Sequence, residues 1–134
     1  MFTQATTGGD VSFQLSFEDL FASGTYDVDW KVCQADRPSE TFADFVDGVE
    51  VGEWHFAVGV WTGAQSILYL DGVERAGTRT AGVKFDGSPF MLGADWESGG
   101  SIEDTFDGVI DDLRICRRVL GVAEQLALMA AVGP

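Results

Sequence analysis

Apolar and polar residues alternate with a period of two along much of the chain. In VSFQLSF, residues 11–17, the large apolar side chains share one face and small polar side chains share the other. YDVDWKVC, residues 26–33, repeats this pattern with Asp27, Asp29 and Lys31 opposite its apolar face. Because successive side chains of a strand point to opposite faces, both segments predict strands with one face in a core and the other in water.

A third segment, WHFAVGVW at residues 54–61, is apolar on both faces. Trp54, Phe56, Val58 and Val60 alternate with a second face that is smaller but still partly apolar. Such a run is typical of a strand that other layers cover on both sides. We therefore expect this segment to form a central strand.

SILYLDGVERAG, residues 66–77, predicts a β-hairpin. Asp71 and Gly72 tolerate the positive φ angles that both central positions of a type I′ turn require. This turn would place Leu70 opposite Val73 on the neighbouring strand.

Two further segments, residues 89–94 and 106–116, predict a short strand and a long final strand. Between them lies a glycine-containing acidic loop at residues 95–108. Residues 120–132 lack alternation and are rich in good helix formers, so they predict a short helix. About seven strands followed by one helix indicate an all-β fold, an antiparallel β-sandwich built as a single domain over residues 1–134.

The charge of the chain narrows the choice of partner. Its 134 residues carry 22 acidic and eight basic side chains, which give a formal net charge of −14. Nucleic acids and anionic membranes are bound mainly through basic residues, so neither is an expected partner. No apolar run approaches the roughly 20 residues that cross a bilayer, and the first residues do not resemble a signal peptide.

Cysteine and histidine are too few for a structural zinc site. Such a site takes about four Cys or His ligands, and the chain has only Cys33, Cys116 and His55. Both cysteines lie in strand-like runs, and we expect them to be free and partly buried, with a disulfide between them as the open alternative. We expect His55 to be an ordinary residue on a strand face, since no Ser or Cys nucleophile is paired with it in a triad.

Four motifs in the same order resemble those of the laminin G-like or concanavalin A-like jelly roll, particularly its bacterial branch. They are GEWHFAVGVW, ILYLDGVE, FMLGA and FDGVIDDLRICRRVL, the last followed by a helix with Glu124. Two positions depart from the family pattern. Cys116 stands where an aromatic residue is usual, and Gly121 stands where Ser or Thr would cap the helix. Glycine is a tolerable N-cap, so we expect the helix start to be only slightly weakened.

Compared with the family it resembles, the chain is short at its front, so it is either a compact variant or lacks strands that the fold normally pairs. Family members usually carry several strands before the part that matches residues 11–17, whereas ten residues precede it here. An unpaired sheet edge exposes backbone donors and acceptors and favours association. We therefore expect a second copy to complete the sandwich, so that the protein is a homo-oligomer.

The resemblance implies a lectin-like, non-catalytic module that binds a carbohydrate or a protein surface, in an extracellular or cell-surface setting. A structural domain that completes its sandwich by self-assembly is the alternative. A small glycoside hydrolase is a third hypothesis, but hydrolases of this fold use two glutamates in an E-x-D-x-x-E string, which is missing here. We therefore expect no enzymatic activity.

The candidate binding residues are aromatic and acidic side chains that a core does not explain. Sugars stack on exposed aromatic rings, and Trp96 and Trp61 are the candidates for such contacts. Calcium takes about six to eight oxygen ligands, and the family often holds calcium at the rim of the sandwich. Asp95 and Asp104, beside flexible glycines, are the candidate ligands, with an ordinary acidic surface loop as the open alternative.

Asp111 and Asp112 lie inside the apolar run of the predicted final strand. Strict alternation places Asp111 on the more apolar face, where it would need hydrogen bonds from backbone amides, an arginine or a tryptophan N–H. Asp112 and Arg114 share the other face, two residues apart, and are better placed for pairing with residues of neighbouring strands. We favour a structural role for both aspartates over metal binding, and metal binding over catalysis.

Overall fold

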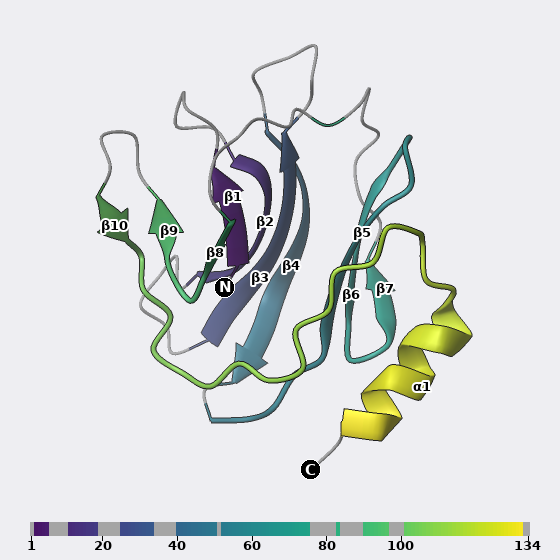
Figure 1. The fold of residues 1–134 in the computed structure, drawn as a ribbon. Coiled ribbons are helices and arrows are strands. Elements are labelled where there is room, and N and C mark those ends of the chain that lie inside the picture. Colours follow the sequence, from purple (N-terminus) through teal and green to yellow (C-terminus); the bar gives the residue numbers. More distant parts are fainter. Residues whose placement is uncertain are drawn as a thin grey trace.

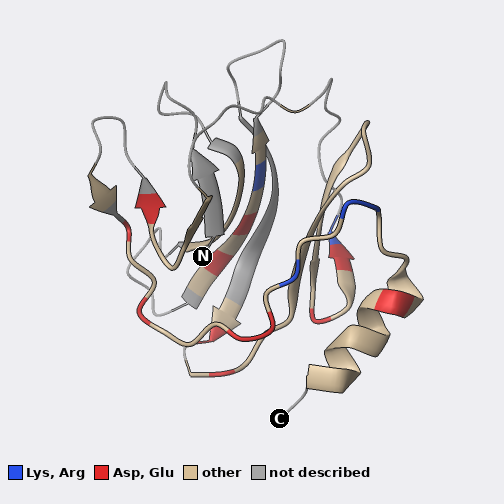
Figure 2. Ribbon diagram, viewed as in Figure 1, with Lys and Arg blue, Asp and Glu red and all other residues tan. Residues whose placement is uncertain are grey.

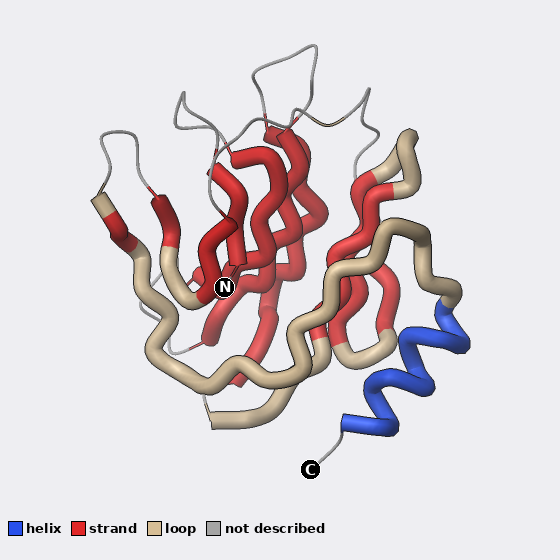
Figure 3. Tube along the Cα trace, viewed as in Figure 1, coloured by secondary structure: helices blue, strands red, loops and turns tan. Residues whose placement is uncertain are grey.

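The structure, a computed structural model, consists of antiparallel strands and one C-terminal helix (Figure 1). It describes residues 2–5, 11–18, 25–33, 40–50, 52–75, 83, 90–96 and 101–132. The predicted all-β sandwich with a single short helix at its C-terminal end is confirmed. Figure 3 shows the larger sheet beside a smaller one, with the helix against the smaller sheet.

The larger sheet has five strands in the order β4-β3-β2-β1-β8. The five strands are β1 (Phe2–Ala5), β2 (Val11–Glu18), β3 (Thr25–Cys33), β4 (Glu40–Glu50) and β8 (Phe90–Leu92). The alternating segments therefore form strands as predicted. In the β2–β3 register Leu15 lies opposite Trp30, which places the apolar positions of both strands in common rows.

The smaller sheet consists of β5 (Ala57–Trp61), β6 (Ser66–Leu70) and β7 (Val73–Arg75). The turn between β6 and β7 has φ angles of 50° at Asp71 and 77° at Gly72. Leu70 pairs with Val73. Both the positive φ angles and this register confirm the predicted hairpin.

The hydrophobic core lies between the two sheets. Its buried residues are Leu15, Val28, Trp30, Val32, Val49, Leu68 and Leu70. Five of them come from the larger sheet and two from β6, so the core joins the layers rather than belonging to one. Burying each of the larger aliphatic side chains contributes roughly 1.5–3 kcal/mol.

Trp30 makes the closest contact between the layers. A Cβ atom built on Gly59 of β5 would lie 2.3 Å from the Trp30 ring, so only glycine leaves room for the indole there. The indole Nε1–H donates a hydrogen bond to the carbonyl oxygen of Val60 at 3.2 Å. The ring therefore lies flat against β5 while its one polar group is satisfied.

The prediction for residues 54–61 is only partly right. Ala57 packs against the core and Val60 is buried, so both faces of β5 are covered. However, Trp54 precedes the strand and is 60% exposed, and among the described residues β5 pairs with β6 alone. In the described part of the chain β5 is therefore an edge strand rather than a central one.

The prediction of a long final strand over residues 106–116 is wrong. Residues 104–121, which we call the C-terminal strap, run without strand structure from β10 (Ile102–Glu103) to α1 (Val122–Val132). Phe106 anchors the start, since its N–H donates to the Gly93 carbonyl at 2.8 Å and its ring lies 5.8 Å from that of Phe17. Beyond it, Asp112 adopts a φ of 50°, which interrupts an extended backbone.

Because the strap is not a strand, the environments of Asp111, Asp112 and Cys116 differ from those expected. Asp111 is exposed rather than on an apolar face, and its Oδ1 accepts the Asp112 N–H at 2.8 Å. Asp112 pairs with Arg114, whose Nε donates to Asp112 Oδ1 at 2.9 Å. Both aspartates thus have local structural contacts, as favoured above. Cys116 is exposed, not partly buried, and the side chain of Cys33 lies outside the described residues.

The contact between Trp30 and Gly59 leads to a stability prediction. Gly59→Ala should lower the free energy of unfolding by about 1–3 kcal/mol, because the new methyl group overlaps the indole. Chemical denaturation monitored by circular dichroism measures the change. Trp30→Phe provides the matched test. If the two substitutions act through one contact, the double variant should lose less stability than the sum of the single losses. Additive losses would contradict the contact.

Candidate functional site

The acidic segment that was predicted as a loop contains a short antiparallel ribbon. Asp95 and Trp96 form β9, which pairs with β10 through Trp96–Ile102 and Asp95–Glu103. Asp104 follows directly, is exposed and has a φ of 47°. The ribbon therefore brings Asp95 and Asp104 to the same end of two paired strands, and Figure 2 shows acidic residues there.

Asp95 is turned into the protein. Its side chain is buried, and its Oδ2 lies 3.5 Å from the Gln14 Nε2 of β2, a long hydrogen bond. A buried carboxylate requires polar partners. The Gln14–Asp95 contact therefore ties the β9–β10 ribbon to the larger sheet.

Gln14 belongs to a group of polar side chains on one face of β2 and β3. The group consists of Gln14, Ser16 and Asp29, which are buried, and Lys31, which is partly buried. Gln14 lies opposite Lys31 in the strand register, and Ser16 lies opposite Asp29. Lys31 Nζ is 3.9 Å from Asp29 Oδ2, at the outer limit of an ion pair.

The prediction that this face meets water is wrong. Ser16 is fully buried, and Gln14 and Asp29 are each only 6% exposed. Period-two alternation distinguishes a polar from an apolar face, but it does not distinguish water from a polar layer of protein. Whether a polar face meets water or protein depends on long-range contacts such as Gln14–Asp95, and no local sequence pattern predicts them.

The calcium candidates do not gain further acidic ligands from the described part of the chain. There, no group of three or more His, Cys, Asp or Glu side chains is arranged to hold a metal ion. Calcium needs about six to eight oxygen ligands, of which Asp95 and Asp104 could supply only some. Calcium binding therefore stays a prediction.

The two candidate tryptophans lie on different sheets. Trp61 ends β5, pairs with Ser66 and is 37% exposed. Trp96 lies on β9, and its side chain is outside the described residues. β5 and β9 lie on opposite sides of the molecule in Figure 1, so the two tryptophans do not form one stacking platform.

His55 has a more specific role than the expected strand-face position. It precedes β5, and its Nδ1 lies 2.8 Å from Asp71 Oδ2 in the β6–β7 turn. Phe56 N–H donates to Asp71 Oδ1 at 2.8 Å, and Asp71 N–H donates back to the Phe56 carbonyl at 2.8 Å. These bonds fix the segment before β5 to the hairpin turn. The Trp-His and Asp-Gly pairs of the sequence motifs are the signal that could have predicted them.

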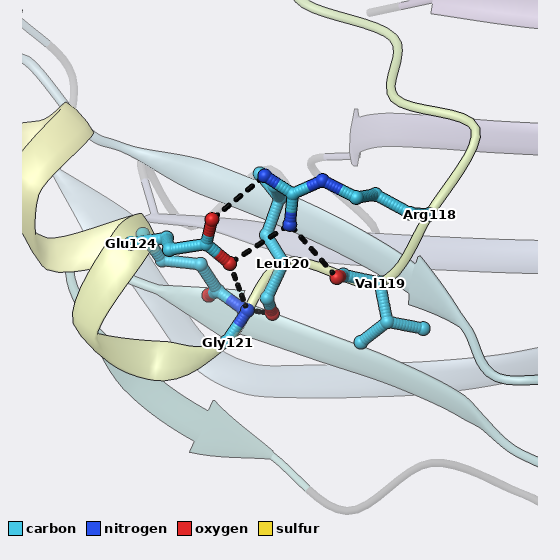
Figure 4. A network of polar contacts seen from close by, with 6 residues as sticks. Arg118, Val119, Leu120, Gly121 and Glu124 are labelled. Carbon is cyan, nitrogen blue, oxygen red and sulfur yellow. Dashed lines mark hydrogen bonds and ion pairs between the residues drawn. The ribbon is translucent and has the colours of Figure 1, made fainter.

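The start of α1 is fixed by a polar network that Figure 4 shows. Glu124 Oε2 accepts the Gly121 N–H at 2.9 Å, while the Glu124 N–H donates to the Gly121 carbonyl at 3.0 Å. Gly121 thus occupies the N-cap of half a capping box, in which Glu124 binds back to the N-cap amide while glycine offers no side-chain oxygen for the reciprocal bond. The pattern Gly-x-x-Glu in the sequence could have predicted this arrangement.

Arg118 completes the network from the strap. Its Nη2 and Nη1 donate to Glu124 Oε1 at 2.7 Å and Oε2 at 2.9 Å, a bidentate pair. The Arg118 hydrogen bond, followed by that of the Gly121 N–H, lowers the pKa of the Glu124 carboxyl from its ordinary value of 4.5 to about 2. The same pairing raises the pKa of Arg118.

Comparison with protein families agrees with this architecture. The model of a laminin G-like family, described as the concanavalin A-like lectin/glucanases superfamily, matches residues 1–124. The chain belongs to the laminin G-like family. No curated protein and no solved structure gave a significant match to this laminin G-like domain.

Family membership fixes the class of function only broadly. Laminin G-like and concanavalin A-like domains often bind carbohydrates or proteins, and the superfamily also contains glycosidases. Among the described residues, no helix of this laminin G-like domain is long and apolar enough to cross a membrane.

The lowered pKa of Glu124 predicts how the domain responds to acid. A carboxylate whose pKa is lower in the folded state stabilises the fold fully above its unfolded pKa. That contribution should be lost as the pH falls from about 4.5 towards about 2. Glu124→Gln should therefore lower the midpoint of thermal unfolding at neutral pH, and its deficit relative to the parent should shrink across this range.

The matched control is Glu53→Gln, because Glu53 is an exposed glutamate before β5, away from α1. It shares the change of charge but not the capping contacts. Unfolding midpoints of the parent and both variants, measured over the same pH series, separate the two effects. A Glu124→Gln deficit that is independent of pH would show that Arg118 and Gly121 do not favour the ionised carboxylate.

Proposed function

We propose that this laminin G-like domain is a non-catalytic binding module whose ligand is a carbohydrate. A protein surface is the second ligand class. In either case we place the ligand at the β9–β10 ribbon. The observation that carries the proposal is the burial of Asp95 against Gln14. This contact adds a side-chain tie to β2 to the packing of β9 against β1 and β8. A fixed ribbon can present its other residues without losing much conformational entropy on binding.

Trp96 is the residue to which we assign the main ligand contact. It follows Asp95 on β9, and successive positions of a strand alternate between faces. Since Asp95 is the inward position, the alternation of a strand leads us to assign Trp96 to the outward one. An aromatic ring beside acidic groups offers the stacking surface and hydrogen-bond acceptors that suit a sugar. Trp61, partly exposed at the end of β5, is the second candidate contact.

The absence of an E-x-D-x-x-E string supports a binding role rather than glycoside hydrolysis. Hydrolysis requires two carboxyl groups held on either side of the scissile bond. The described contacts of Asp95 and Asp29 are to Gln14 and Lys31, which suits structural carboxylates.

A glycan array tests the carbohydrate proposal. Trp96→Ala should weaken binding to the recognised glycans roughly tenfold or more, because truncating a central tryptophan removes a large share of the contact energy. Trp54→Ala is the matched control, since Trp54 is 60% exposed and lies before β5, away from the ribbon. Unchanged binding by Trp96→Ala contradicts the assigned contact. A parent that recognises no glycan contradicts the carbohydrate ligand.

We also propose that calcium binds at the same rim through Asp104 and Asp95. Calcium chloride should then raise the midpoint of thermal unfolding, since a ligand of the native state stabilises it by mass action, and excess chelator should reverse the rise. Asp104→Asn should reduce the shift without disturbing the fold, because Asp104 is exposed. Magnesium chloride at equal ionic strength is the control. An equal response to both salts, or none, contradicts a calcium site.

A different observation favours the alternative function, self-assembly. The C-terminal strap and α1 carry large apolar side chains that the chain does not cover. This surface is separate from the β9–β10 ribbon and is treated next.

A further inference from the structure

The C-terminal strap leaves most of its large apolar residues in solvent. Val109 is 71% exposed and Ile115 is 62% exposed. Ile110, Leu113 and Val119 are exposed as well. These residues belong to a segment without strand structure, and its backbone forms no ladder with any strand that the structure describes. A run of this kind has both apolar side chains and backbone groups available for a partner strand.

Helix α1 extends this apolar surface. Among its residues only Gln125 is buried, although the sequence of the helix is apolar on all sides. Val122 and Leu126 are among its exposed residues. A helix that is apolar all round is normally buried. The strap and α1 together therefore expose eight large aliphatic side chains: Val109, Ile110, Leu113, Ile115, Val119, Val122, Leu126 and Val132. Exposed apolar side chains gathered on neighbouring segments are typical of a surface that a partner covers.

The charges of the strap are unlike those of the rest of the chain. Three of the six arginines lie between residues 114 and 118, in a chain with a net charge of −14. Figure 2 shows this basic stretch along the strap, with acidic residues just before it. The strap therefore carries both signs of charge in a short run, and a partner with the same sequence could match them.

We propose that two copies of this chain associate through their straps, paired antiparallel about a two-fold axis between Asp112 and Leu113. This register places Asp111 opposite the partner's Arg114 and Ile110 opposite the partner's Ile115. By symmetry each contact occurs twice. Opposite charges and apolar pairs directly across an antiparallel ladder both favour pairing. A register shifted so that Cys116 lies opposite the partner's Cys116 would instead place Arg114 opposite the partner's Arg118.

Association requires a local rearrangement of Asp112. In the single chain Asp112 has a φ of 50° and holds Arg114, with Arg114 Nη2 at 2.9 Å from Asp112 Oδ2. A paired strand needs Asp112 in the extended region. Arg114 then exchanges Asp112 for the partner's Asp111, so the ion pair is replaced rather than lost. Strand formation in the strap is therefore coupled to dimerisation.

A charge exchange tests this register. Sedimentation velocity over a wide range of concentrations, with reductant present because Cys116 is exposed, gives the dissociation constant of the dimer. Asp111→Arg and Arg114→Asp each place like charges opposite one another twice, so each should weaken the dimer on the order of tenfold. The double variant Asp111→Arg/Arg114→Asp restores both pairs and should recover the parent's affinity. The two single variants, mixed in equal amounts, should form a heterodimer more readily than either forms a homodimer.

Two further variants make the test selective. Arg117→Asp changes the charge as Arg114→Asp does, but the register places Arg117 opposite the partner's Gly108, so its dissociation constant should change little. Ile115→Thr should weaken the dimer, and because Ile115 is 62% exposed the fold of the single chain does not depend on it. A parent that is monomeric throughout, a dimer indifferent to these substitutions, or an exchange variant that stays weak would each overturn the proposal. None of these results bears on glycan binding at the β9–β10 ribbon.

Discussion

The fit of Trp30 against the backbone of β5 is the constraint on which the rest of the structure depends. The indole can lie there only because residue 59 has no side chain, and its N–H is satisfied by the Val60 carbonyl. This contact sets the separation of the two sheets at the centre of the core. The position of β5 then determines that of the β6–β7 hairpin, whose Asp71 binds His55 and the Phe56 amide. The hairpin in turn supports α1, because Leu126 lies beside Gly72 so closely that a Cβ there would meet it at 2.6 Å.

Features that depend on neighbouring residues could be predicted from the sequence, and features that depend on distant ones could not. The apolar rows of β2 and β3 and the turn at Asp71-Gly72 follow from alternation and from the φ angles that the turn residues tolerate. The strap shows the limit of the same rule. Residues 109–115 are rich in β-branched and apolar residues like a strand, but a strand also requires a partner, and among the described residues none pairs with this segment.

The candidate site was predictable in location but not in geometry. The acidic residues around Asp95 marked a surface feature, yet β9 pairs with β10 and the buried Asp95 contacts Gln14, which is 81 residues away in the sequence. The same contact shows that protein groups, and not only water, meet the polar face of β2. Polar alternation reports that a face needs hydrogen bonds, and a second protein layer can supply them as well as water can.

The polar contacts around the start of α1 order the C-terminal part of the chain internally, whereas Phe106 against Phe17 and Leu126 beside Gly72 join it to the rest of the domain. Arg118 and Gly121 fix the start of α1 through Glu124, and the buried Gln125 donates from Nε2 to the Leu120 carbonyl at 3.0 Å. These bonds set the direction of the helix but cover little apolar surface, because Val122 and Leu126 remain exposed. Hydrogen bonds to exposed groups contribute little net stability, whereas uncovered aliphatic side chains forgo the larger hydrophobic term. An element ordered in this way has a fixed backbone but leaves apolar side chains exposed. This is the state expected of a surface that another molecule covers.

The β9–β10 ribbon is the opposite case, since the burial of Asp95 attaches it within the chain. The two surfaces can therefore serve separate partners, one bound by a rigid rim and the other by a strap that gains its strand structure on association.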